Sequence, residues 1–482
     1  MRRWVVLAGL LVVVTVAVIV FRTDGGPTLE PDGPSTAPPI GGGAEGPNVV
    51  IILTNDQRWD TLWAMPVVQR SLVARGTTFQ NAFVVNPSCC PSRASILTGL
   101  YSHSTGVYRN HAPHGGFESF DDRSSVAGWL DAAGYETALV GEYLNGYGSD
   151  DPIPPGWDRW FALGQRNDGA TKAYYNYEVN ADGQIETYGD APEDYSTDVL
   201  ADEAVRFVSE AEGPFFLYFA PAAPHEPAIP PPRYADAFDD LKPWRPESYD
   251  ERDLSDKPAW LRALAARIGP HRLADGDRFR IDQYRTLLAV DDAVGRIVAA
   301  LRDGRRLSDT ILLFASDNGY IWGEHGMDGK GVPYEESIRI PLVMRYDDLG
   351  ARTSAVEEMA LNVDLAPTIA ALTRIDAPTM EGLSLVPLLT GEGRWARRDF
   401  LIEHLGAEHV PSFCAVRTTR AKYAAYGDGS EELYDLRRDP FELENLIGVA
   451  PPRRVAALRA RLTELCDPLP PGYPGVPGPA GR

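Results

Sequence analysis

Lysine is rare in this sequence, and acidic residues outnumber basic ones. Aspartate and glutamate number 68 against 46 lysines and arginines, so the chain carries a net charge of −22. Such a charge repels nucleic acids and anionic membrane surfaces, so neither is expected to be the main partner. An anionic substrate would need a local cationic pocket, which makes each lysine informative. The lysines are Lys172, Lys242, Lys257, Lys330 and Lys422.

Cysteine is also scarce, which excludes a scaffold held together by disulfides. The chain has 4 cysteines, and they lie in two kinds of position. Cys89 and Cys90 are adjacent, and adjacent cysteines rarely bridge each other because the geometry is strained. Cys414 and Cys466 both lie in the C-terminal part, and the sequence leaves open whether they pair in an oxidising compartment.

One apolar run, at the N-terminus, is long enough to enter a membrane. Residues 4–21 carry no charge and follow Arg2 and Arg3. This run is at the lower limit for spanning a bilayer, is longer than the apolar part of most signal peptides, and no clear cleavage site follows it. We predict a signal anchor or signal peptide over residues 1–21, with the anchor favoured. We predict a flexible Gly/Pro-rich linker over residues 22–47. The rest of the chain would then lie outside the cytoplasm, either anchored to the membrane or secreted.

Three short apolar runs predict buried parallel strands, and a polar cluster follows each of them. In open α/β sheets, sites form beyond the carboxyl ends of such strands, so we expect these clusters to meet. The runs and their clusters are residues 49–54 before Asn55-Asp56, residues 215–220 before Pro224-His225, and residues 311–316 before Asp317-Asn318-Gly319.

Helical segments complete an α/β pattern. Residues 124–133 and 284–301 have apolar residues at helical spacing, and we assign no catalytic role to Asp291 and Asp292 in the second segment. Past Val363, shorter strands with turn signals replace this alternation. We predict a catalytic domain over residues 48–362, a smaller α+β subdomain over residues 363–466 and a Pro/Gly-rich tail over residues 467–482.

Cys89 opens the string Cys89-Cys90-Pro91-Ser92-Arg93, which Leu97-Thr98-Gly99 follows at short distance. Pro91 suits a first helical turn, and the apolar residues after it predict a helix. Cys89 would then lie just before the helix N-terminus, where backbone donors and the helix dipole favour an anion. Considered alone, the pair is more typical of two ordinary buried cysteines beside a helix cap.

This string resembles the modification signature of the sulfatase family, in which the first cysteine is oxidised to formylglycine. Further motifs occur in the family's order, and the resemblance covers roughly residues 48–447. It implies an α/β fold, the alkaline phosphatase-like sandwich with a large mixed central sheet and a smaller C-terminal α+β subdomain. The further motifs are residues 48–56, Gly134-Tyr135-Glu136-Thr137-Ala138, Pro224-His225, Ser316-Asp317-Asn318-Gly319, Gly329-Lys330-Gly331 and Leu433-Tyr434-Asp435-Leu436.

The resemblance also implies a mechanism. A formylglycine-generating enzyme converts Cys89, the resulting aldehyde hydrates to a diol, one hydroxyl attacks sulfur, and the other then expels sulfate and restores the aldehyde. The site must neutralise the sulfate oxygens, because an anionic ester repels nucleophiles. The resemblance implies that three residues act on the substrate. Arg93 orients the diol and supplements the positive charge, His225 binds sulfate or transfers a proton, and Lys330 holds the sulfate and eases the leaving oxygen away.

A divalent metal ion belongs to the same implied site. The implied ligands are Asn55, Asp56, Asp317, Asn318 and the modified Cys89. Oxygen donors of this kind suit Ca²⁺, with Mg²⁺ as the second choice. A single Asp-Asn pair after a strand is more often a turn or a helix cap, but here two pairs occur in the family's order.

Two positions depart from the family pattern. Most sulfatases have two acids where this chain has Asn55-Asp56, so one implied ligand is neutral here. Glu142 stands where the family places an active-site lysine, and a carboxylate about 4 Å from a sulfate oxygen would cost on the order of 4 kcal/mol at an effective dielectric of about 20. Four alternatives would each remove that repulsion. Glu142 could be protonated, pair with an arginine such as Arg109, contact a cationic part of the substrate, or point away from the site.

Three functions fit these observations. The leading one is hydrolysis of sulfuric esters, and the forms Cys-Cys-Pro-Ser-Arg and Tyr143-Leu144-Asn145 most resemble the glucosamine-6-sulfatase and heparan-type branch, which suggests a sulfated glycan. The second is hydrolysis of phosphonate or phosphate esters on the same scaffold. The third is a non-catalytic binding protein that keeps the fold and has lost the lysine.

Overall fold

The computed structural model describes residues 46–164, 173–350, 354–406 and 409–477, apart from the side chains of residues 269–274. The chain divides into two units, residues 1–42 and residues 43–482, and every described residue belongs to the second. The predicted anchor and nearly all of the predicted linker therefore lie outside the described residues. Among the residues that are described, no helix combines the length and the apolar character needed to cross a membrane.

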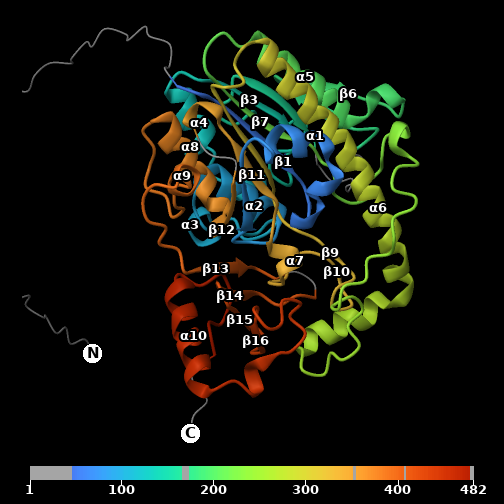
Figure 1. Ribbon diagram of the computed structural model, residues 1–482, viewed down its shortest axis with the longest axis vertical. Coiled ribbons are helices and arrows are strands. Elements are labelled where there is room, and N and C mark those ends of the chain that lie inside the picture. Colours follow the sequence, from blue (N-terminus) through green and yellow to red (C-terminus); the bar gives the residue numbers. More distant parts are fainter. Residues whose placement is uncertain (1–45, 165–172, 351–353, 407–408, 478–482) are drawn as a thin grey trace, which may run out of the picture. The chain divides into compact units, whose positions relative to one another are not determined.

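A ten-stranded mixed sheet forms the centre of the described unit (Figure 1). Its five middle strands run parallel to one another, and an antiparallel strand follows on each side of them. The strands, in order across the sheet, are β12 (Ser354–Leu361), β2 (Thr77–Phe83), β11 (Leu342–Arg345), β8 (Thr310–Ser316), β1 (Asn48–Thr54), β7 (Phe215–Ala220), β3 (Glu136–Gly141), β4 (Arg159–Leu163), β5 (Glu178–Ala181) and β6 (Gln184–Thr187).

Strand β1 shows how the middle of the sheet is buried on both faces. Val50 and Ile52 belong to one apolar core, and Ile51 and Leu53 belong to another, because side chains along a strand alternate in direction. Continuous apolar runs are typical of parallel strands that helices cover on both sides. The three strands predicted over residues 49–54, 215–220 and 311–316 are confirmed as β1, β7 and β8.

Helices cover both faces of the large sheet, as Figure 1 shows. On one face lie α5 (Ser196–Glu210) and α6 (Ala259–Asp303), and on the other lie α2 (Cys89–Thr98), α4 (Val126–Ala132) and α8 (Leu365–Thr373). The two predicted helices are confirmed as α4 and as part of the longer α6. The shorter helices are α1 (Pro66–Val68), α3 (Ser102–Thr105), α7 (Glu335–Ile338) and α9 (Val386–Thr390).

Asp291 and Asp292 have structural contacts on α6. The carboxylate of Asp291 accepts hydrogen bonds from the backbone N–H groups of Val67 and Val68, each at 2.8 Å, and so caps α1. Asp292 accepts a hydrogen bond from the hydroxyl of Tyr234 at 2.6 Å. Both acids therefore tie other segments to α6.

A smaller antiparallel sheet forms the predicted C-terminal α+β subdomain. Helix α10 (Pro452–Leu465) packs on this sheet, and a disulfide between Cys414 and Cys466 links the sheet to the residue after that helix. The pairing that the sequence left open is thus present. The strands are β13 (Asp399–His404), β14 (Phe413–Thr418), β15 (Ala421–Tyr426) and β16 (Glu431–Asp435), while β9 (Ile321–Trp322) and β10 (Asp328–Gly329) form a separate pair.

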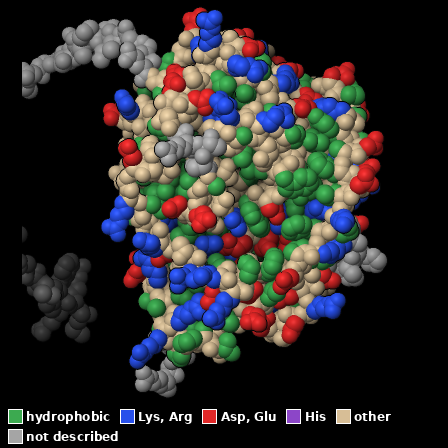
Figure 2. All heavy atoms as spheres, in the orientation of Figure 1, with side chains coloured by type: hydrophobic (Ala, Val, Ile, Leu, Met, Phe, Trp, Pro, Cys, Tyr) green, Lys and Arg blue, Asp and Glu red, His purple; other side chains and the backbone are tan. Residues whose placement is uncertain are grey.

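The face of the molecule in Figure 2 carries acidic and basic side chains in alternation, with apolar side chains gathered between them. No continuous basic band of the kind that follows a nucleic-acid backbone is visible among the described residues on that face. This face therefore offers no extended cationic surface for a polyanion.

Candidate active site at the carboxyl edge of the large sheet

Four neighbouring parallel strands deliver the polar clusters to one edge of the sheet. The register pairs Thr54 at the end of β1 with Ser316 at the end of β8, and Gly141 at the end of β3 with Ala220 at the end of β7. All four strands run in the same direction, so the residues that follow them meet, as predicted. These residues are Asn55 and Asp56 after β1, Asp317 and Asn318 after β8, His225 after β7 and Glu142 after β3.

Gly141 permits the close approach of β3 to β7 just before Glu142. Its φ is +121°, and a Cβ at this position would lie 2.1 Å from the carbonyl oxygen of Ala220. No residue with a side chain fits there without moving backbone. The amide N–H of Glu142 donates to that same carbonyl at 2.7 Å, which fixes where Glu142 enters the site.

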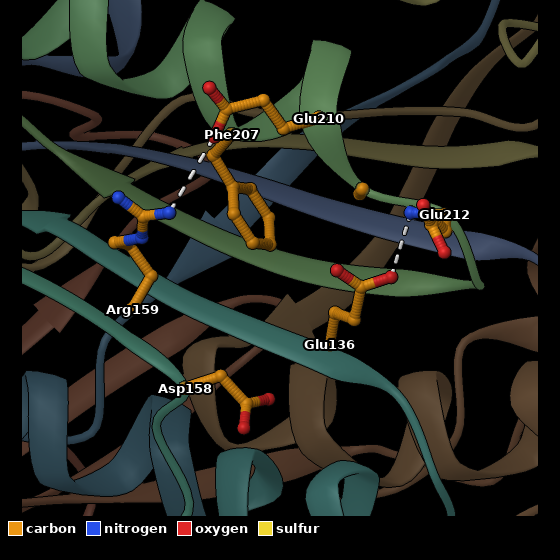
Figure 3. A pocket seen from close by; sticks show the side chains of 7 residues that line it. Glu136, Asp158, Arg159, Phe207, Glu210 and Glu212 are labelled. Carbon is orange, nitrogen blue, oxygen red and sulfur yellow. Dashed lines mark hydrogen bonds and ion pairs between the residues drawn. The ribbon is translucent and has the colours of Figure 1, made fainter.

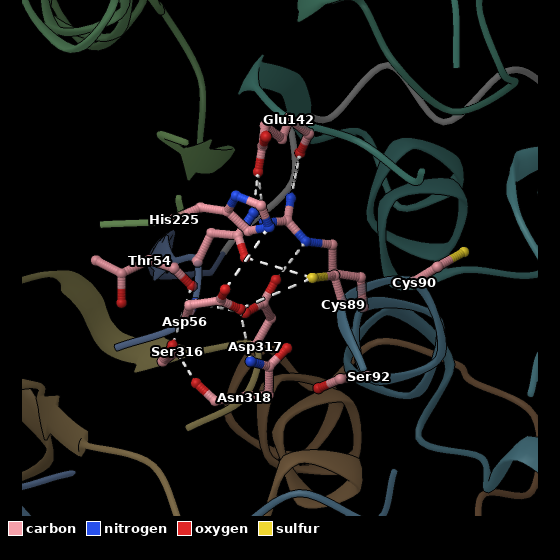
Figure 4. Close-up of polar contacts among 12 residues, drawn as sticks. Thr54, Asp56, Cys89, Cys90, Ser92, Glu142, His225, Ser316, Asp317 and Asn318 are labelled. Carbon is pink, nitrogen blue, oxygen red and sulfur yellow. Dashed lines mark hydrogen bonds and ion pairs between the residues drawn. The ribbon is translucent and has the colours of Figure 1, made fainter. Parts of the chain in front are cut away.

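Cys89 is the first residue of α2. The sequence predicted it just before the helix, so the helix begins one residue earlier than expected. Ser88 is extended, with φ −139° and ψ 146°, and the helix ends at the left-handed Gly99. The Cys89 sulfur therefore lies at a helix N-terminus, the position that favours an anion. Figure 4 shows this sulfur pointing toward Asp56, whereas the sulfur of Cys90 points away from the cluster.

Lys330 makes the shortest contact with the Cys89 sulfur. Its Nζ lies 2.8 Å from Sγ and also contacts Asp56 Oδ1. Asn55 Oδ1 lies 3.4 Å and Asp56 Oδ1 3.9 Å from the same sulfur. Burial opposes a charge on Lys330, but the carboxylate of Asp56 outweighs it and raises the pKa of the lysine above its ordinary value. Lys330 therefore presents a charged ammonium group to the sulfur.

The unmodified thiol is poorly suited to act as a nucleophile. Burial raises the pKa of Cys89 well above its ordinary value, and the nearby carboxylates of Asp317 and Asp56 add to this, whereas Lys330 opposes it. A cysteine nucleophile must be a thiolate, so Cys89 in this setting stays protonated and unreactive at neutral pH. The surroundings thus suit a neutral or metal-bound group at residue 89 better than a thiolate.

The oxygen-bearing side chains around residue 89 fit a hard divalent cation. Asn55, Asp56, Asp317 and Asn318 are all at most 4% exposed. Asn318 donates from Nδ2 to Asp56 Oδ1 at 2.7 Å, while its own buried Oδ1 has no hydrogen-bond partner. A buried acceptor without a donor is costly unless something coordinates it, and Ca²⁺ and Mg²⁺ prefer such oxygens. One ligand atom each from Asp56, Cys89 and His225 also lies within 4.8 Å of the other two.

His225 presents one ring nitrogen to this cluster. Its Nδ1 lies 2.7 Å from the backbone carbonyl oxygen of Glu226, which only a ring N–H can satisfy. In the neutral ring, Nε2 is then the acceptor, and it lies 3.6 Å from Asp56 Oδ2. The side chain is 28% exposed, so His225 connects the buried cluster with solvent.

Arg93 is held between two carboxylates. Its Nε donates to Asp317 Oδ2 and its Nη2 donates to Glu142 Oε2, each at 2.9 Å. Burial opposes the charge of Arg93, but these two carboxylates raise the pKa of the guanidinium above its ordinary value. Pairing of Glu142 with an arginine, one of the predicted alternatives, is confirmed, and that arginine is Arg93. The Nε of Arg109, named as an example, donates to the Pro113 carbonyl. Glu142 points into the site.

A further histidine, His404 on β13, lies beside the loop that carries Lys330. Its Nδ1 lies 3.1 Å from Asn86 Oδ1, and a Cβ built on Gly331, the residue after Lys330, would lie 3.6 Å from its Nε2. Burial lowers the pKa of His404 to about 4, so this ring is neutral at pH 7. No local pattern marks the residue, since its strand lies about 70 residues beyond the Lys330 loop and only the fold joins them.

The cavity in Figure 3 lies elsewhere and is not the candidate site. It has a volume of about 360 Å³ and lies at the amino ends of β3 and β4, where Glu136 and Arg159 begin those strands. Glu136 is engaged in accepting hydrogen bonds from the backbone N–H groups of Glu212 and Gly213, each at 2.8 Å. The convergent polar groups lie at the opposite end of the strands.

Two family models match the sequence. The model described as "Sulfatase" matches residues 47–375, which is more than half of the chain. The chain belongs to the sulfatase family. The second model, described as "N-sulphoglucosamine sulphohydrolase, C-terminal", matches residues 323–467 of this sulfatase. These residues include the small sheet.

Known sulfatases are similar over most of the described unit. A putative extracellular sulfatase Sulf-1 homolog of Caenorhabditis elegans is 34% identical over 354 residues, which are 71% of this chain, and the chain spans 49% of that protein. Human N-acetylglucosamine-6-sulfatase is 30% identical over 481 residues, with 88% of this chain and 85% of that protein covered. A solved structure, described as a complex with its substrate D-glucosamine-2-N,6-O-disulfate, is 26% identical, has a TM-score of 0.72 and covers 88% of this chain and 98% of that one.

These similarities confirm the predicted fold. The described unit has the large mixed sheet and the small C-terminal antiparallel sheet expected of an alkaline phosphatase-like sulfatase. The sequence-predicted site residues Asn55, Asp56, Cys89, Arg93, His225, Asp317, Asn318 and Lys330 all lie in one cluster.

Proposed function

We propose that this chain hydrolyses sulfuric esters at residue 89. The observation that carries the proposal is the position of the Cys89 sulfur, at a helix N-terminus, 2.8 Å from the ammonium of Lys330 and facing the oxygens of Asn55 and Asp56. The sulfur stands in for the oxygen of the modified side chain. An anion bound there would meet the helix dipole and a cation together.

Residue 89 and a metal ion would share the chemistry. Converted to formylglycine by a formylglycine-generating enzyme, residue 89 supplies an oxygen nucleophile, and a Ca²⁺ or Mg²⁺ held by Asn55, Asp56, Asp317 and Asn318 would neutralise charge on the reacting oxygens. The high pKa of the Cys89 thiol supports the need for this conversion, since the unmodified side chain is not a thiolate.

The remaining residues have distinct tasks. Lys330 binds the sulfate and stabilises the oxygen that leaves, because its charge is fixed by Asp56. His225 exchanges a proton between the site and solvent through Nε2. Arg93 orients Asp317 and Glu142, and those two carboxylates share its charge, so it supplies less free positive charge than the resemblance implied.

We further propose a sulfated amino sugar, within a glycan or free, as the substrate class. Human N-acetylglucosamine-6-sulfatase is similar over most of both chains, and a structural relative binds a sulfated glucosamine as its substrate. The site is consistent with this class, since the helix N-terminus at residue 89 and the ammonium of Lys330 would meet the anionic sulfate ester.

Export from the cytoplasm also belongs to the proposal, as does a division between a large-sheet domain and a smaller C-terminal subdomain. Because α8 (Leu365–Thr373) packs on the large sheet, we propose this division after residue 373 and not at residue 363. The disulfide between Cys414 and Cys466 supports an oxidising compartment. The apolar run over residues 4–21 and the extracellular naming of the worm relative agree with it. An anchor and a cleaved signal peptide would both deliver the chain there, and protein sequencing of the exported form separates them.

The test begins with the mass of the peptide that contains residue 89, from protein made in a host that forms formylglycine. Conversion lowers this mass by about 18 Da, because a carbonyl oxygen replaces the thiol and a hydrogen. Activity is then measured with an aryl sulfate, an aryl phosphonate and glucosamine 6-sulfate. We expect the converted protein to cleave the sulfates and Cys89→Ala to be inactive, whereas Cys90→Ala, the neighbouring thiol outside the cluster, keeps activity within about threefold.

Two results would overturn this proposal. Cleavage of the phosphonate in strong preference to both sulfates would make the chain a phosphonate hydrolase. Absence of cleavage by converted, metal-loaded protein would make it a binding protein.

A further inference from the structure

We propose that Glu142 is a positioning residue that fixes the amide of Asn55 so that its oxygen faces residue 89. The two positions at which the sequence departs from the family pattern are direct partners: Asn55 Nδ2 donates to Glu142 Oε2 at 2.7 Å. The asparagine in place of an acid at position 55 and the glutamate in place of a lysine at position 142 therefore complement each other. The inference rests on the proposed function only in treating Asn55 as a metal ligand.

The chemistry of the contact sets the direction of the amide. A carboxylate oxygen can only accept, so Asn55 must turn its NH₂ group toward Glu142. Its Oδ1 is then forced to the opposite end, where it lies 3.4 Å from the Cys89 sulfur. Because this hydrogen bond fixes the orientation of the Asn55 amide, the amide oxygen is already directed toward a cation before the cation binds.

Arg93 makes this arrangement stable in a buried place. Asn55 is 4% exposed, Glu142 5% and Arg93 1%, so an unpaired carboxylate would be costly there. Arg93 donates to Glu142 Oε2 with Nη2 and to the Glu142 backbone carbonyl with Nη1, each at 2.9 Å. The same guanidinium reaches Asp317 with Nε, so one network orients two proposed metal ligands, Asn55 and Asp317.

The hydrogen bond between residues 55 and 142 depends on both residue types. An aspartate at position 55 would place a second carboxylate where the amide now lies, 2.7 Å from Glu142, and the two charges would repel each other. A lysine at position 142 would instead attract that aspartate. The sign of the Asn55→Asp effect on stability should therefore depend on the residue at position 142.

Metal affinity provides the first test, measured by calorimetry with CaCl₂ and MgCl₂ on protein that carries Cys89→Ala and cannot turn over. We expect Glu142→Ala to weaken binding about tenfold, as loss of an outer partner of a ligand does, and Glu142→Gln, which keeps an acceptor for Asn55, to stay within about threefold. Glu335→Ala is the matched control, because Glu335 is also buried and pairs with Arg417 away from the site. It should lower the unfolding temperature and leave metal affinity unchanged.

Thermal unfolding in EDTA provides the second test. Asn55→Asp is expected to lower the unfolding temperature when residue 142 is glutamate and to raise it when Glu142→Lys is also present. The inference is wrong if Glu142→Gln weakens metal binding as much as Glu142→Ala, since charge alone would then explain the effect. It is equally wrong if the Asn55→Asp effect keeps one sign, or if the parent binds neither metal.

Failure of the proposed function gives a different pattern. In that case the metal affinities and unfolding temperatures follow the expectations above, while converted protein cleaves no sulfate. If only the positioning role fails, sulfate is cleaved and the calorimetric differences vanish.

Discussion

The ammonium of Lys330 lies 2.8 Å from the sulfur of Cys89, although 241 residues separate them in the chain. One lysine of the few in this protein thus faces the first residue of α2. Its second contact, with Asp56, keeps the lysine charged and ties it to a proposed metal ligand. A helix N-terminus and this side chain therefore supply positive charge for an anionic substrate in an otherwise acidic protein.

Removing this charge should impair catalysis more than folding. We expect Lys330→Met to lower kcat/KM for a sulfate ester by about 10²- to 10³-fold, the effect of losing one preorganised group at a developing charge. Steady-state kinetics measure this loss. Lys242→Met is the control, because Lys242 is exposed and lies outside the cluster. Equal activities of the two variants would contradict the role of Lys330.

Chelation should remove activity and stability together. A cation bound by Asn55, Asp56, Asp317 and Asn318 would stabilise the folded state by mass action, by about 2.7 kcal/mol when its concentration is a hundred times its Kd. We expect EDTA to lower the unfolding temperature and abolish ester cleavage, and CaCl₂ or MgCl₂ to restore both. Asp317→Asn should reduce the restoration, and an unchanged unfolding temperature in EDTA would exclude this site.

Asp291 and Asp292 are adjacent on α6 but differ in importance. Asp291→Ala would leave the N–H groups of Val67 and Val68 without their acceptor, at a cost of about 1–3 kcal/mol in the free energy of unfolding. Asp292→Ala, whose carboxylate is 42% exposed, should cost about 1 kcal/mol or less. Denaturant unfolding compares them. Equal losses would contradict the capping role.

The pH dependence of stability should report His103. Burial opposes its charge, but hydrogen bonds to Glu381 and Glu403 raise its pKa to about 10. A raised histidine pKa stabilises the folded state fully below pH 6.5, and this stabilisation is lost as the pH rises from 6.5 toward 10. We expect a contribution of about 1 kcal/mol, since Glu381 is partly exposed and water screens the pair. His103→Gln should flatten the unfolding temperature across this range, and an unchanged slope would contradict it.

The disulfide between Cys414 and Cys466 should stabilise the C-terminal subdomain. It closes a loop of 52 residues, and in the chain-entropy view a bridge of this span contributes about 2–4 kcal/mol. The double variant Cys414→Ala/Cys466→Ala, measured by denaturant unfolding, should lose about this amount. Cys90→Ala, which removes a buried thiol without a bridge, serves as the control and should lose less.

Much of the fold could be predicted because its signals are local. Runs and spacings of apolar residues predict the three buried strands and the helices around residues 124–133 and 284–301. No such pattern marks the positive φ of Gly141 at the end of β3. Long-range partners were less accessible. Pairing of Cys414 with Cys466 stayed open, Arg109 was suggested in place of Arg93, and His404 was missed, because sequence spacing does not reveal which strands become neighbours.

The sequence by itself determined the order of polar clusters after apolar strands and the cysteine string at a helix start. These features are local, since each depends on residues within a few positions of one another. They sufficed to indicate the family and to predict eight site residues that the structure brings into one cluster. Only the tertiary structure decided how Glu142 is accommodated. Whether a carboxylate in that place repels a substrate or holds a ligand depends on which donors reach it, and Asn55 and Arg93 reach it from two other elements, 87 and 49 residues away.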